Sequence, residues 1–205
     1  MSEKSSAKLN DEATRSVVMA GVGGQGTILA ANLLANALLA HGYDVKTSEV
    51  HGMAQRGGSV ISMVRFGGAV ASPLVPMGEA DALLGTELLE TLRNLEFLAP
   101  QGKVIASRTR VDPLPVLQGT VEYPADAEER ILSLWPESII VDAPAIAAEA
   151  GDARAANTVL LGILSPELPV GVDEWLAVIG KLVKAKAVEA NRNAFLVGRE
   201  LAGKR

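Results

Sequence analysis

Residues 16–40 read SVVMAGVGGQGTILAANLLANALLA. The first part, Ser16–Val22, is a short apolar run rich in valine, which is typical of a strand buried on both faces. The run leads into a glycine-rich turn, Gly21–Gly26. Thr27–Ala40 then supplies strong helix formers up to Gly42, where the helix is expected to end. The stretch therefore predicts a strand, a glycine turn and a helix, the opening unit of a Rossmann-like α/β fold.

The remainder of the chain alternates strand-like and helix-like segments and then becomes helical. We expect further strands at Tyr43–Val50, Ser59–Phe66, Ala82–Gly85, Lys103–Ser107 and Glu137–Asp142. Helix formers predict helices at Glu87–Phe97, Pro144–Ala150, Ala153–Leu164, Val172–Gly180 and Ala185–Leu201. We therefore expect an α/β fold, a three-layer α/β/α sandwich that is a Rossmann-like variant with a helical C-terminal region. It would comprise a disordered tail at residues 1–14 and a single domain at residues 15–205.

The composition of the 205 residues excludes several chemistries. The chain has no cysteine, which rules out disulfides, a thiol nucleophile and an iron–sulfur cluster held by its own thiolates. Because it has only two histidines, His41 and His51, we expect no metal site. The formal net charge of -5 favours neither nucleic acid nor an anionic membrane as a partner.

The sequence contains no apolar run that approaches the ~20 residues of a membrane span. Its first fifteen residues, MSEKSSAKLNDEATR, are polar and lack the apolar core of a signal peptide. We therefore expect a cytoplasmic protein that does not enter a membrane.

The glycine turn satisfies the pattern G-x-G-x-x-G between a strand and a helix. Its glycines allow a tight turn and let a phosphate approach backbone N–H groups at the start of the helix. Glu49, near the end of the second predicted strand, stands where a ribose-binding carboxylate would be expected. The alternative is a structural turn that packs strand against helix, and the sequence leaves both interpretations open. The candidate residues of the turn are Gly21, Gly23, Gly24, Gln25 and Gly26.

A second glycine-rich loop follows, because residues 49–59 read EVHGMAQRGGS. It carries a carboxylate, an imidazole, an amide and a guanidinium within eight positions, a combination suited to recognising a polar ligand or a partner. Arg56 is suited to bidentate binding of a carboxylate or phosphate. Alternatively, His51 and Arg56 bond nearby carbonyl groups or Glu49. The candidate residues of this loop are Glu49, His51, Gln55, Arg56, Gly57 and Gly58.

Asn157 is a polar residue within the apolar helical run Ala153–Leu164. A buried asparagine needs a hydrogen-bond partner, so it either caps a neighbouring loop or faces a cleft. The chain shows no recognisable triad of nucleophile, histidine and acid, and no carboxylate pair with an acid/base arrangement. It is therefore interpreted as a binding partner rather than a self-sufficient catalyst, with catalytic residues unassigned.

These motifs carry a family resemblance. GVGGQG at residues 21–26 and TSEVHGMAQRGGSV at residues 47–60 resemble the gamma-type module of 2-oxoacid:ferredoxin oxidoreductases. The form HGMAQRGG is similar in particular to the beta (small) subunit of the indolepyruvate:ferredoxin oxidoreductases. The resemblance continues through SPLVP at 72–76, NTVLLG at 157–162 and EAN at 189–191, so it covers nearly the whole chain beyond the N-terminal tail.

The resemblance implies a reaction that is shared between subunits. The family decarboxylates an aryl 2-oxoacid such as indolepyruvate, couples the product to coenzyme A and passes two electrons to ferredoxin. Thiamine diphosphate, its magnesium ion and the iron–sulfur clusters would reside in the large (alpha) subunit, so this chain alone would hold no cofactor. It would complete the assembled enzyme and help shape a coenzyme A or substrate region through its two glycine loops. Expressed alone, it is expected to be inactive and to form a homodimer.

Two other functions remain open from the sequence. The turn glycines together with Glu49 also fit an oxidoreductase that binds a nicotinamide or flavin nucleotide, NAD(P) or FAD, by itself. A non-catalytic module that lends its α/β surface to assembly would equally explain the missing catalytic constellation. Titration with NADH, NADPH or FAD separates the first of these functions from the subunit interpretation.

Overall fold

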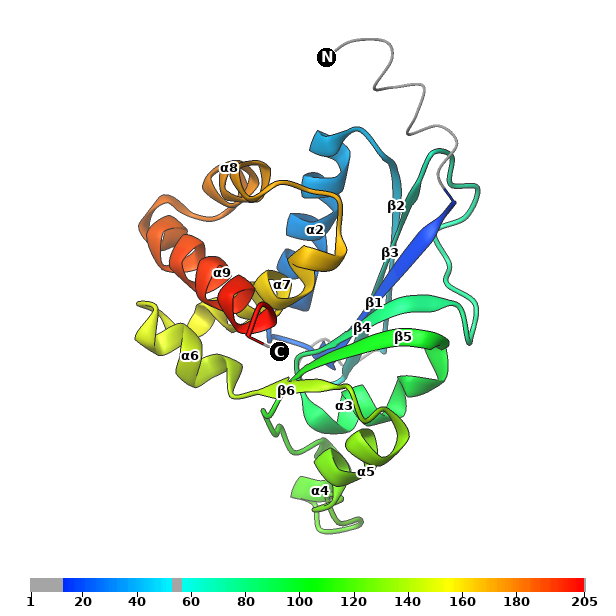
Figure 1. Cartoon of the computed structure of the whole chain (residues 1–205). Coiled ribbons are helices and arrows are strands. Elements are labelled where there is room, and N and C mark those ends of the chain that lie inside the picture. Colours follow the sequence, from blue (N-terminus) through cyan, green and yellow to red (C-terminus); the bar gives the residue numbers. More distant parts are fainter. Residues whose placement is uncertain (1–12, 53–56, 205) are drawn as a thin grey trace.

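The structure, a computed structural model, describes residues 13–52 and 57–204. Within this described part, six strands form one sheet in the order β2-β3-β1-β4-β5-β6 (Figure 1). β3 is antiparallel to both of its neighbours, whereas β1, β4, β5 and β6 are parallel to one another. The strands are β1 (Arg15–Val22), β2 (Asp44–His51), β3 (Ser59–Gly67), β4 (Ala80–Gly85), β5 (Leu98–Ser107) and β6 (Ile139–Val141).

Helices cover both faces of the sheet (Figure 1). One layer contains α2 (Thr27–His41), α6 (Ala143–Glu149), α7 (Ala156–Leu164), α8 (Val172–Leu182) and α9 (Val188–Ala202). The other layer contains α3 (Leu88–Arg93), α4 (Leu114–Leu117) and α5 (Ala127–Leu134). Short 3-10 turns occupy Leu95–Phe97, Ala153–Ala155, Ser165–Glu167 and Ala185–Ala187. The expected three-layer sandwich with a helical C-terminal region is confirmed.

β1 lies near the centre of the sheet because it is apolar on both sides. All of its residues except Arg15 are buried. Val17 and Met19 face the core under α2 and α7, whereas Val18 and Ala20 face the core under α3 and α5. A strand with apolar residues at every position is stable only where both faces are covered, which is the position that β1 occupies.

The position of β2 departs from a Rossmann unit, in which the second strand lies beside the first. Here β2 is the edge strand, and β3 lies between it and β1. The seven residues 52–58 that separate β2 from β3 are too few for a parallel crossover, so β3 returns as the antiparallel arm of a hairpin. β2 accordingly carries mostly exposed, polar side chains.

The predicted elements are present, with differences that have local causes. The predicted helix Glu87–Phe97 is divided, because α3 ends at Arg93 and the side chain of Asn94 donates a hydrogen bond to the carbonyl oxygen of Glu90 at 2.8 Å. α4 and α5 have no counterpart among the predicted elements. Only Ala127 and Ile131 of α5 are buried, so its apolar pattern is weak. The expected tail at residues 1–14 lies almost wholly outside the described residues.

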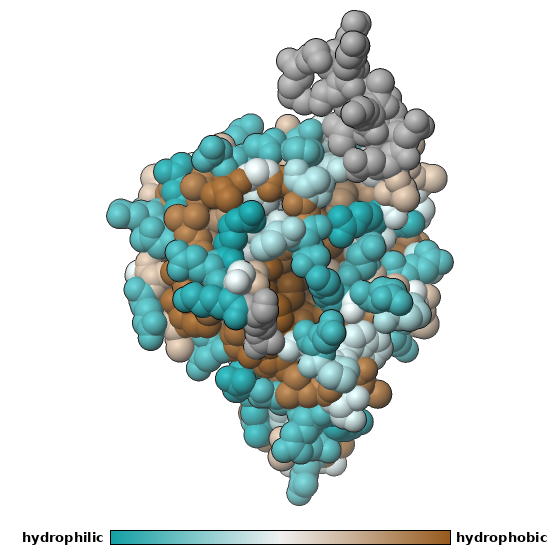
Figure 2. All heavy atoms as spheres, viewed as in Figure 1, coloured by the Kyte–Doolittle hydropathy of each residue, from teal (hydrophilic) through white to brown (hydrophobic). Residues whose placement is uncertain are grey.

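The face shown in Figure 2 carries a mixture of polar and apolar side chains, with apolar surface also gathered towards its middle. A cavity of about 530 Å³ lies between β5, β6 and the end of α7, and Trp135, Ile139 and Ile163 are among its lining residues. In the described ranges no helix combines the length and the apolar character needed to cross a membrane.

Two glycines allow α7 and α9 to pack backbone against backbone. A Cβ atom at Gly162 would stand 2.2 Å from the carbonyl oxygen of Phe195, and one at Gly198 would stand 2.1 Å from that of Val159. Such distances are too short for any side chain. The two helices therefore approach as closely as their main chains permit, which fixes the position of α7 in its layer.

We predict that Gly198→Ala destabilises the fold, because its methyl group must push the two backbones apart. Overpacking of this kind costs about 1–3 kcal/mol. Urea unfolding followed by circular dichroism measures the change. Gly203→Ala is the matched control, since a Cβ there would lie 3.7 Å from its nearest neighbour, the carbonyl oxygen of Glu200. Equal midpoints for the two variants would contradict the packing argument.

Candidate functional site

The carboxyl ends of the parallel strands bring the candidate residues to one edge of the sheet. The glycine turn follows β1, and Thr86 and Glu87 follow β4, which is parallel to β1. β3 has the opposite direction, so it begins at this edge with Ser59, directly after Gly57 and Gly58. Open α/β sheets bind ligands outside the carboxyl ends of their strands. The two glycine loops predicted from the sequence therefore meet at the edge where a ligand is expected.

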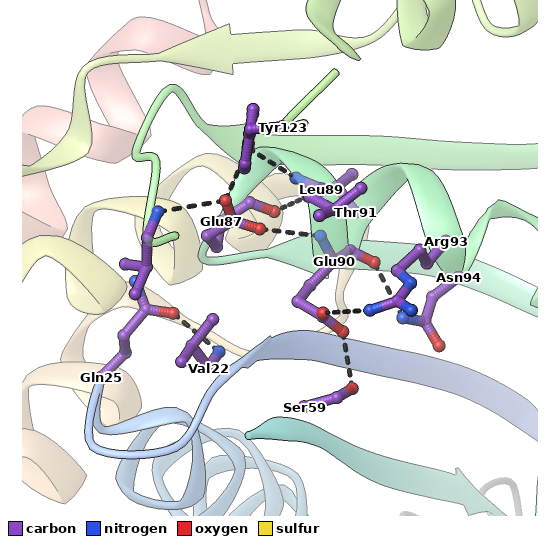
Figure 3. A network of polar contacts seen from close by, with 11 residues as sticks. Val22, Gln25, Ser59, Glu87, Leu89, Glu90, Thr91, Arg93, Asn94 and Tyr123 are labelled. Atoms are coloured by element: carbon purple, nitrogen blue, oxygen red, sulfur yellow. Dashed lines mark hydrogen bonds and ion pairs between the residues drawn. The ribbon is translucent and has the colours of Figure 1, made fainter. Parts of the chain in front are cut away.

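The side chain of Gln25 fixes the conformation of the glycine turn through hydrogen bonds to the turn and to Thr86. Its Oε1 accepts hydrogen bonds from the backbone N–H of Val22 at 2.8 Å (Figure 3) and from the hydroxyl of Thr86 at 2.8 Å. Its Nε2 donates to the carbonyl oxygen of Thr86 at 3.2 Å. These bonds attach the turn to the end of β4 without help from a ligand.

Backbone hydrogen bonds join the two glycine loops. The N–H of Gly23 donates to the carbonyl oxygen of Gly58 at 2.8 Å, and the N–H of Gly57 donates to the carbonyl oxygen of Gly23 at 3.2 Å. These bonds continue the antiparallel ladder in which Val22 lies opposite Ser59. We call the paired residues Gly23, Gly57 and Gly58 the glycine junction. Gln55 and Arg56, which are also candidate residues of the second loop, lie outside the described residues.

Close packing and backbone conformation explain two glycines of the turn. A Cβ atom at Gly21 would stand 1.9 Å from the hydroxyl oxygen of Thr86, so any side chain there would displace that hydroxyl from its bond to Gln25. Gly26 is the N-cap of α2 and has a φ of 80°, a conformation that glycine adopts at little cost. Both glycines therefore have a structural role that requires no phosphate.

A cavity of about 400 Å³ opens beside the turn at the amino end of α2. The first turn of α2 carries no acidic side chain, and its N-cap provides no side-chain hydrogen bond. Backbone N–H groups at such a helix end favour an anion or another hydrogen-bond acceptor. The lining residues are Val22, Gly23, Gly24, Gly26, Thr27, Ile28, His51 and Val60.

His51 brings an exposed imidazole to this cavity from the end of β2. Its Nδ1 lies 3.2 Å from the carbonyl oxygen of Gly52, a bond to a nearby carbonyl group that was one of the two alternatives for this histidine. Glu49 is placed differently, because it is exposed on the edge strand and lies opposite Ser62 of β3. A ribose-binding carboxylate requires the second strand beside the first, so the order of the sheet removes the geometry on which that interpretation of Glu49 depended.

Asn157 reaches the glycine turn from the helical layer. Its Nδ2 donates a hydrogen bond to the backbone carbonyl oxygen of Gln25 at 2.8 Å. Capping a neighbouring loop, one of the two alternatives for this asparagine, is therefore the arrangement found. The turn is held by β4 on one side and by the start of α7 on the other.

Sequence reasoning missed a buried carboxylate beside the turn, that of Glu87 (Figure 3). Glu87 is the N-cap of α3, and its Oε2 accepts a hydrogen bond from the N–H of Glu90 at 2.8 Å. Its Oε1 accepts from the hydroxyl of Tyr123 at 2.6 Å and from the N–H of Val111 at 3.2 Å. Burial, together with the hydrogen bond to Glu87, raises the pKa of Tyr123 above its ordinary value.

Glu90 is the second buried carboxylate of the same helical turn. Its Oε2 accepts a hydrogen bond from the hydroxyl of Ser59 at 2.6 Å, at the start of β3. A signal for these residues exists, because acidic residues three positions apart at a strand-to-helix junction follow the spacing of a capping box. Their partners lie 31 and 36 positions away in the sequence, beyond the reach of local patterns.

Solved structures similar to this chain include two from oxoacid:ferredoxin oxidoreductases. The gamma subunit of a keto/oxoacid ferredoxin oxidoreductase from Geobacter sulfurreducens superposes with a TM-score of 0.68 at 23% identity, covering 93% of this chain and 99% of that chain. A 2-oxoglutarate:ferredoxin oxidoreductase from Magnetococcus marinus gives the same TM-score at 20% identity, covering 94% of this chain and 31% of that one. At these identities the likeness shows the fold, that of an oxoacid oxidoreductase gamma subunit.

Sequence comparison gives the family. Residues 16–201 match the model of the family described as pyruvate ferredoxin/flavodoxin oxidoreductase, and this chain belongs to that family. Curated relatives named indolepyruvate oxidoreductase subunit IorB are 41% identical in Pyrococcus horikoshii and 40% identical in Thermococcus kodakarensis. Each alignment covers 89% of this chain and 93% of the relative. The family resemblance found in the motifs is confirmed.

We predict that Gln25→Ala weakens the fold by loosening the glycine turn. The change leaves the N–H of Val22 without its side-chain acceptor and leaves the hydroxyl of Thr86 only the longer bond to the carbonyl oxygen of Ala20 at 3.4 Å. An unsatisfied buried donor costs about 1–3 kcal/mol. Urea unfolding measures the loss of stability. Gln118→Ala, at an exposed position, is the control and is expected to stay within about 0.5 kcal/mol of the parent. A neutral Gln25→Ala variant would show that the turn does not depend on this side chain.

The raised pKa of Tyr123 gives a prediction about high pH. Because the folded-state pKa lies above the unfolded value, Tyr123 contributes stability that is complete below about pH 10 and is lost as the pH rises further. In a Tyr43→Phe variant Tyr123 is the one tyrosine left, since the chain has two. Ultraviolet absorbance should show it un-ionised at about pH 11 in the folded protein and ionised in denaturant. Ionisation at the same pH in both states would contradict the assignment.

Proposed function

We propose that this chain is the small subunit of a 2-oxoacid:ferredoxin oxidoreductase that acts on indolepyruvate or a similar aryl 2-oxoacid in the cytoplasm. The complex would decarboxylate the oxoacid, transfer the acyl group to coenzyme A and pass the electrons to ferredoxin. The observation that carries the proposal is the identity of about 40% to indolepyruvate oxidoreductase subunits along 89% of the chain. Their name, subunit, supports a partner chain, which we take to be the large (alpha) subunit.

The cofactors of the reaction belong to the partner in this proposal. An iron–sulfur cluster needs thiolate ligands as a rule, and the chain has no cysteine to supply them. Thiamine diphosphate and its magnesium ion would likewise be held by the large subunit, where they supply the chemistry of decarboxylation. The contribution of this chain is then to bind the partner and to complete the walls of the shared site.

The cavity beside the glycine turn is the part of this chain that we assign to the shared site. Its backbone N–H groups at the amino end of α2 suit an anionic group, and coenzyme A carries phosphates. Ile28, which lines the cavity, and its neighbour Leu29 are exposed on the first turn of α2 at 46% and 44%, so the surface at the cavity offers apolar contact area to a partner. The same surface would pair two copies when the chain is expressed alone, which sedimentation detects as a dimer.

The isolated chain should therefore show no turnover, and activity should appear when the large subunit is added. The measurement is indolepyruvate-dependent reduction of a redox dye, with coenzyme A present, for each subunit alone and for the mixture. Because the cofactors would lie in the partner, the small subunit should saturate the rate at a one-to-one ratio.

Two results would contradict this division of labour. Oxidation of a 2-oxoacid by the isolated chain would place the chemistry here. Micromolar binding of NADH, NADPH or FAD by the isolated chain would instead support an independent nucleotide-dependent oxidoreductase. A heat-denatured sample of the small subunit, added in the same amount, controls for carried-over cofactors.

A further inference from the structure

Glu90 has contacts that a simple surface glutamate of a helix would not have. Its side chain is only 6% exposed. Oε2 accepts the hydroxyl hydrogen bond from Ser59 at 2.6 Å, and Oε1 accepts from Nη1 of Arg93 at 3.2 Å (Figure 3). Arg93 is 60% exposed and lies three residues along the same helix, so it supports the carboxylate from the solvent side. The other oxygen, Oε2, is left to Ser59.

Ser59 lies next to the glycine junction, so its hydrogen bond to Glu90 also bears on that junction. Ser59 is the first residue of β3 and follows Gly58, whose carbonyl oxygen accepts the N–H of Gly23. A hydrogen bond to a charged acceptor is among the stronger ones available to a hydroxyl. The carboxylate of Glu90 therefore restrains Ser59 at the point where the chain leaves the glycine junction and enters β3.

The first turn of α3 connects this junction to a second segment. Glu87, one turn before Glu90, holds Val111 and Tyr123 of the segment that follows β5. The N–H of Glu90 donates to the carboxylate of Glu87, so the two acidic residues share one capping arrangement. Two carboxylates are rarely buried together unless each is fully engaged by hydrogen bonds. Both carboxylates are hydrogen-bonded here. That of Glu87 binds the segment with Val111 and Tyr123, and that of Glu90 binds Ser59.

We infer that Glu90 is a positioning residue for the reaction, acting through Ser59 on the glycine junction. It does not touch the cavity itself, because its contacts run to Ser59 and Arg93 rather than to the lining residues. The role in catalysis rests on the proposed function, whereas the restraint on the junction belongs to the isolated chain. The two parts can therefore be tested separately.

The first experiment measures amide hydrogen exchange in the isolated chain by NMR. In Ser59→Ala, the amides of Gly23 and Gly57 should exchange roughly tenfold faster, the scale expected when one strong hydrogen bond is lost. Ser59→Thr retains the hydroxyl and should restore slow exchange. Ser133→Ala, at an exposed position on α5, is the matched control and should leave both amides unchanged. Glu90→Gln removes the negative charge of the acceptor and should also speed the exchange of these two amides. Glu96→Gln, at an exposed position, is its control and should leave them unchanged.

The second experiment uses the complex reconstituted with the large subunit. Ser59→Ala and Glu90→Ala should each lower kcat by about tenfold while KM and the yield of complex stay close to the parent values. Because both act through one contact, the double variant should be no slower than either single variant. Ser59→Thr should recover the rate.

The results that overturn this inference differ from those that refute the proposed function. Unchanged exchange at Gly23 and Gly57 in Ser59→Ala would overturn the inference, and so would faster exchange spread equally over the core strands, since that reports general loss of stability. Multiplied losses in the double variant would also count against it. If Glu90→Ala does not fold, the Ser59 pair of variants still decides the question. A parent chain that never reconstitutes activity refutes the proposed function, and the exchange experiment then stands alone.

Discussion

The side-chain amide of Gln25 is the contact on which the arrangement of the edge depends. It satisfies the backbone of its own turn and the hydroxyl and carbonyl of Thr86 together, while Asn157 bonds its backbone carbonyl. The strand β1, the neighbouring strand β4 and the helical layer thus meet at one residue. A turn held in this way exists before any ligand or partner arrives, so little ordering would remain to be done on binding.

Much of the fold could be predicted from the sequence, because local composition decides it. The apolar run of β1, the glycine turn and the helix formers of α2 gave element boundaries that the structure reproduces within one residue. The order of the strands could not be predicted, since periodicity reports burial and not pairing. The insertion of β3 beside β1, which separates Glu49 from the turn, follows only from the antiparallel pairing of β2 with β3.

The candidate site, like the fold, could be predicted only in part. The two glycine loops and Asn157 were recognisable, because glycines in a turn and an amide in an apolar helix each need a reason. Their mutual contacts were not, since the bond from Asn157 to Gln25 spans 132 positions. Glu87 and Glu90 look like ordinary helix-start residues until Tyr123 and Ser59 are placed against them. Long-range hydrogen bonds therefore account for most of what sequence reasoning missed.

Because of the glycine contact between α7 and α9, these two helices form one rigid unit. Main chains in direct contact cannot compress or change rotamer as a layer of side chains can, so a displacement of one helix moves the other with it. The amino end of α7 carries Asn157, which is bonded to the glycine turn. A displacement of α9, the last helix of the chain, would therefore be transmitted through α7 to the glycine turn that follows β1.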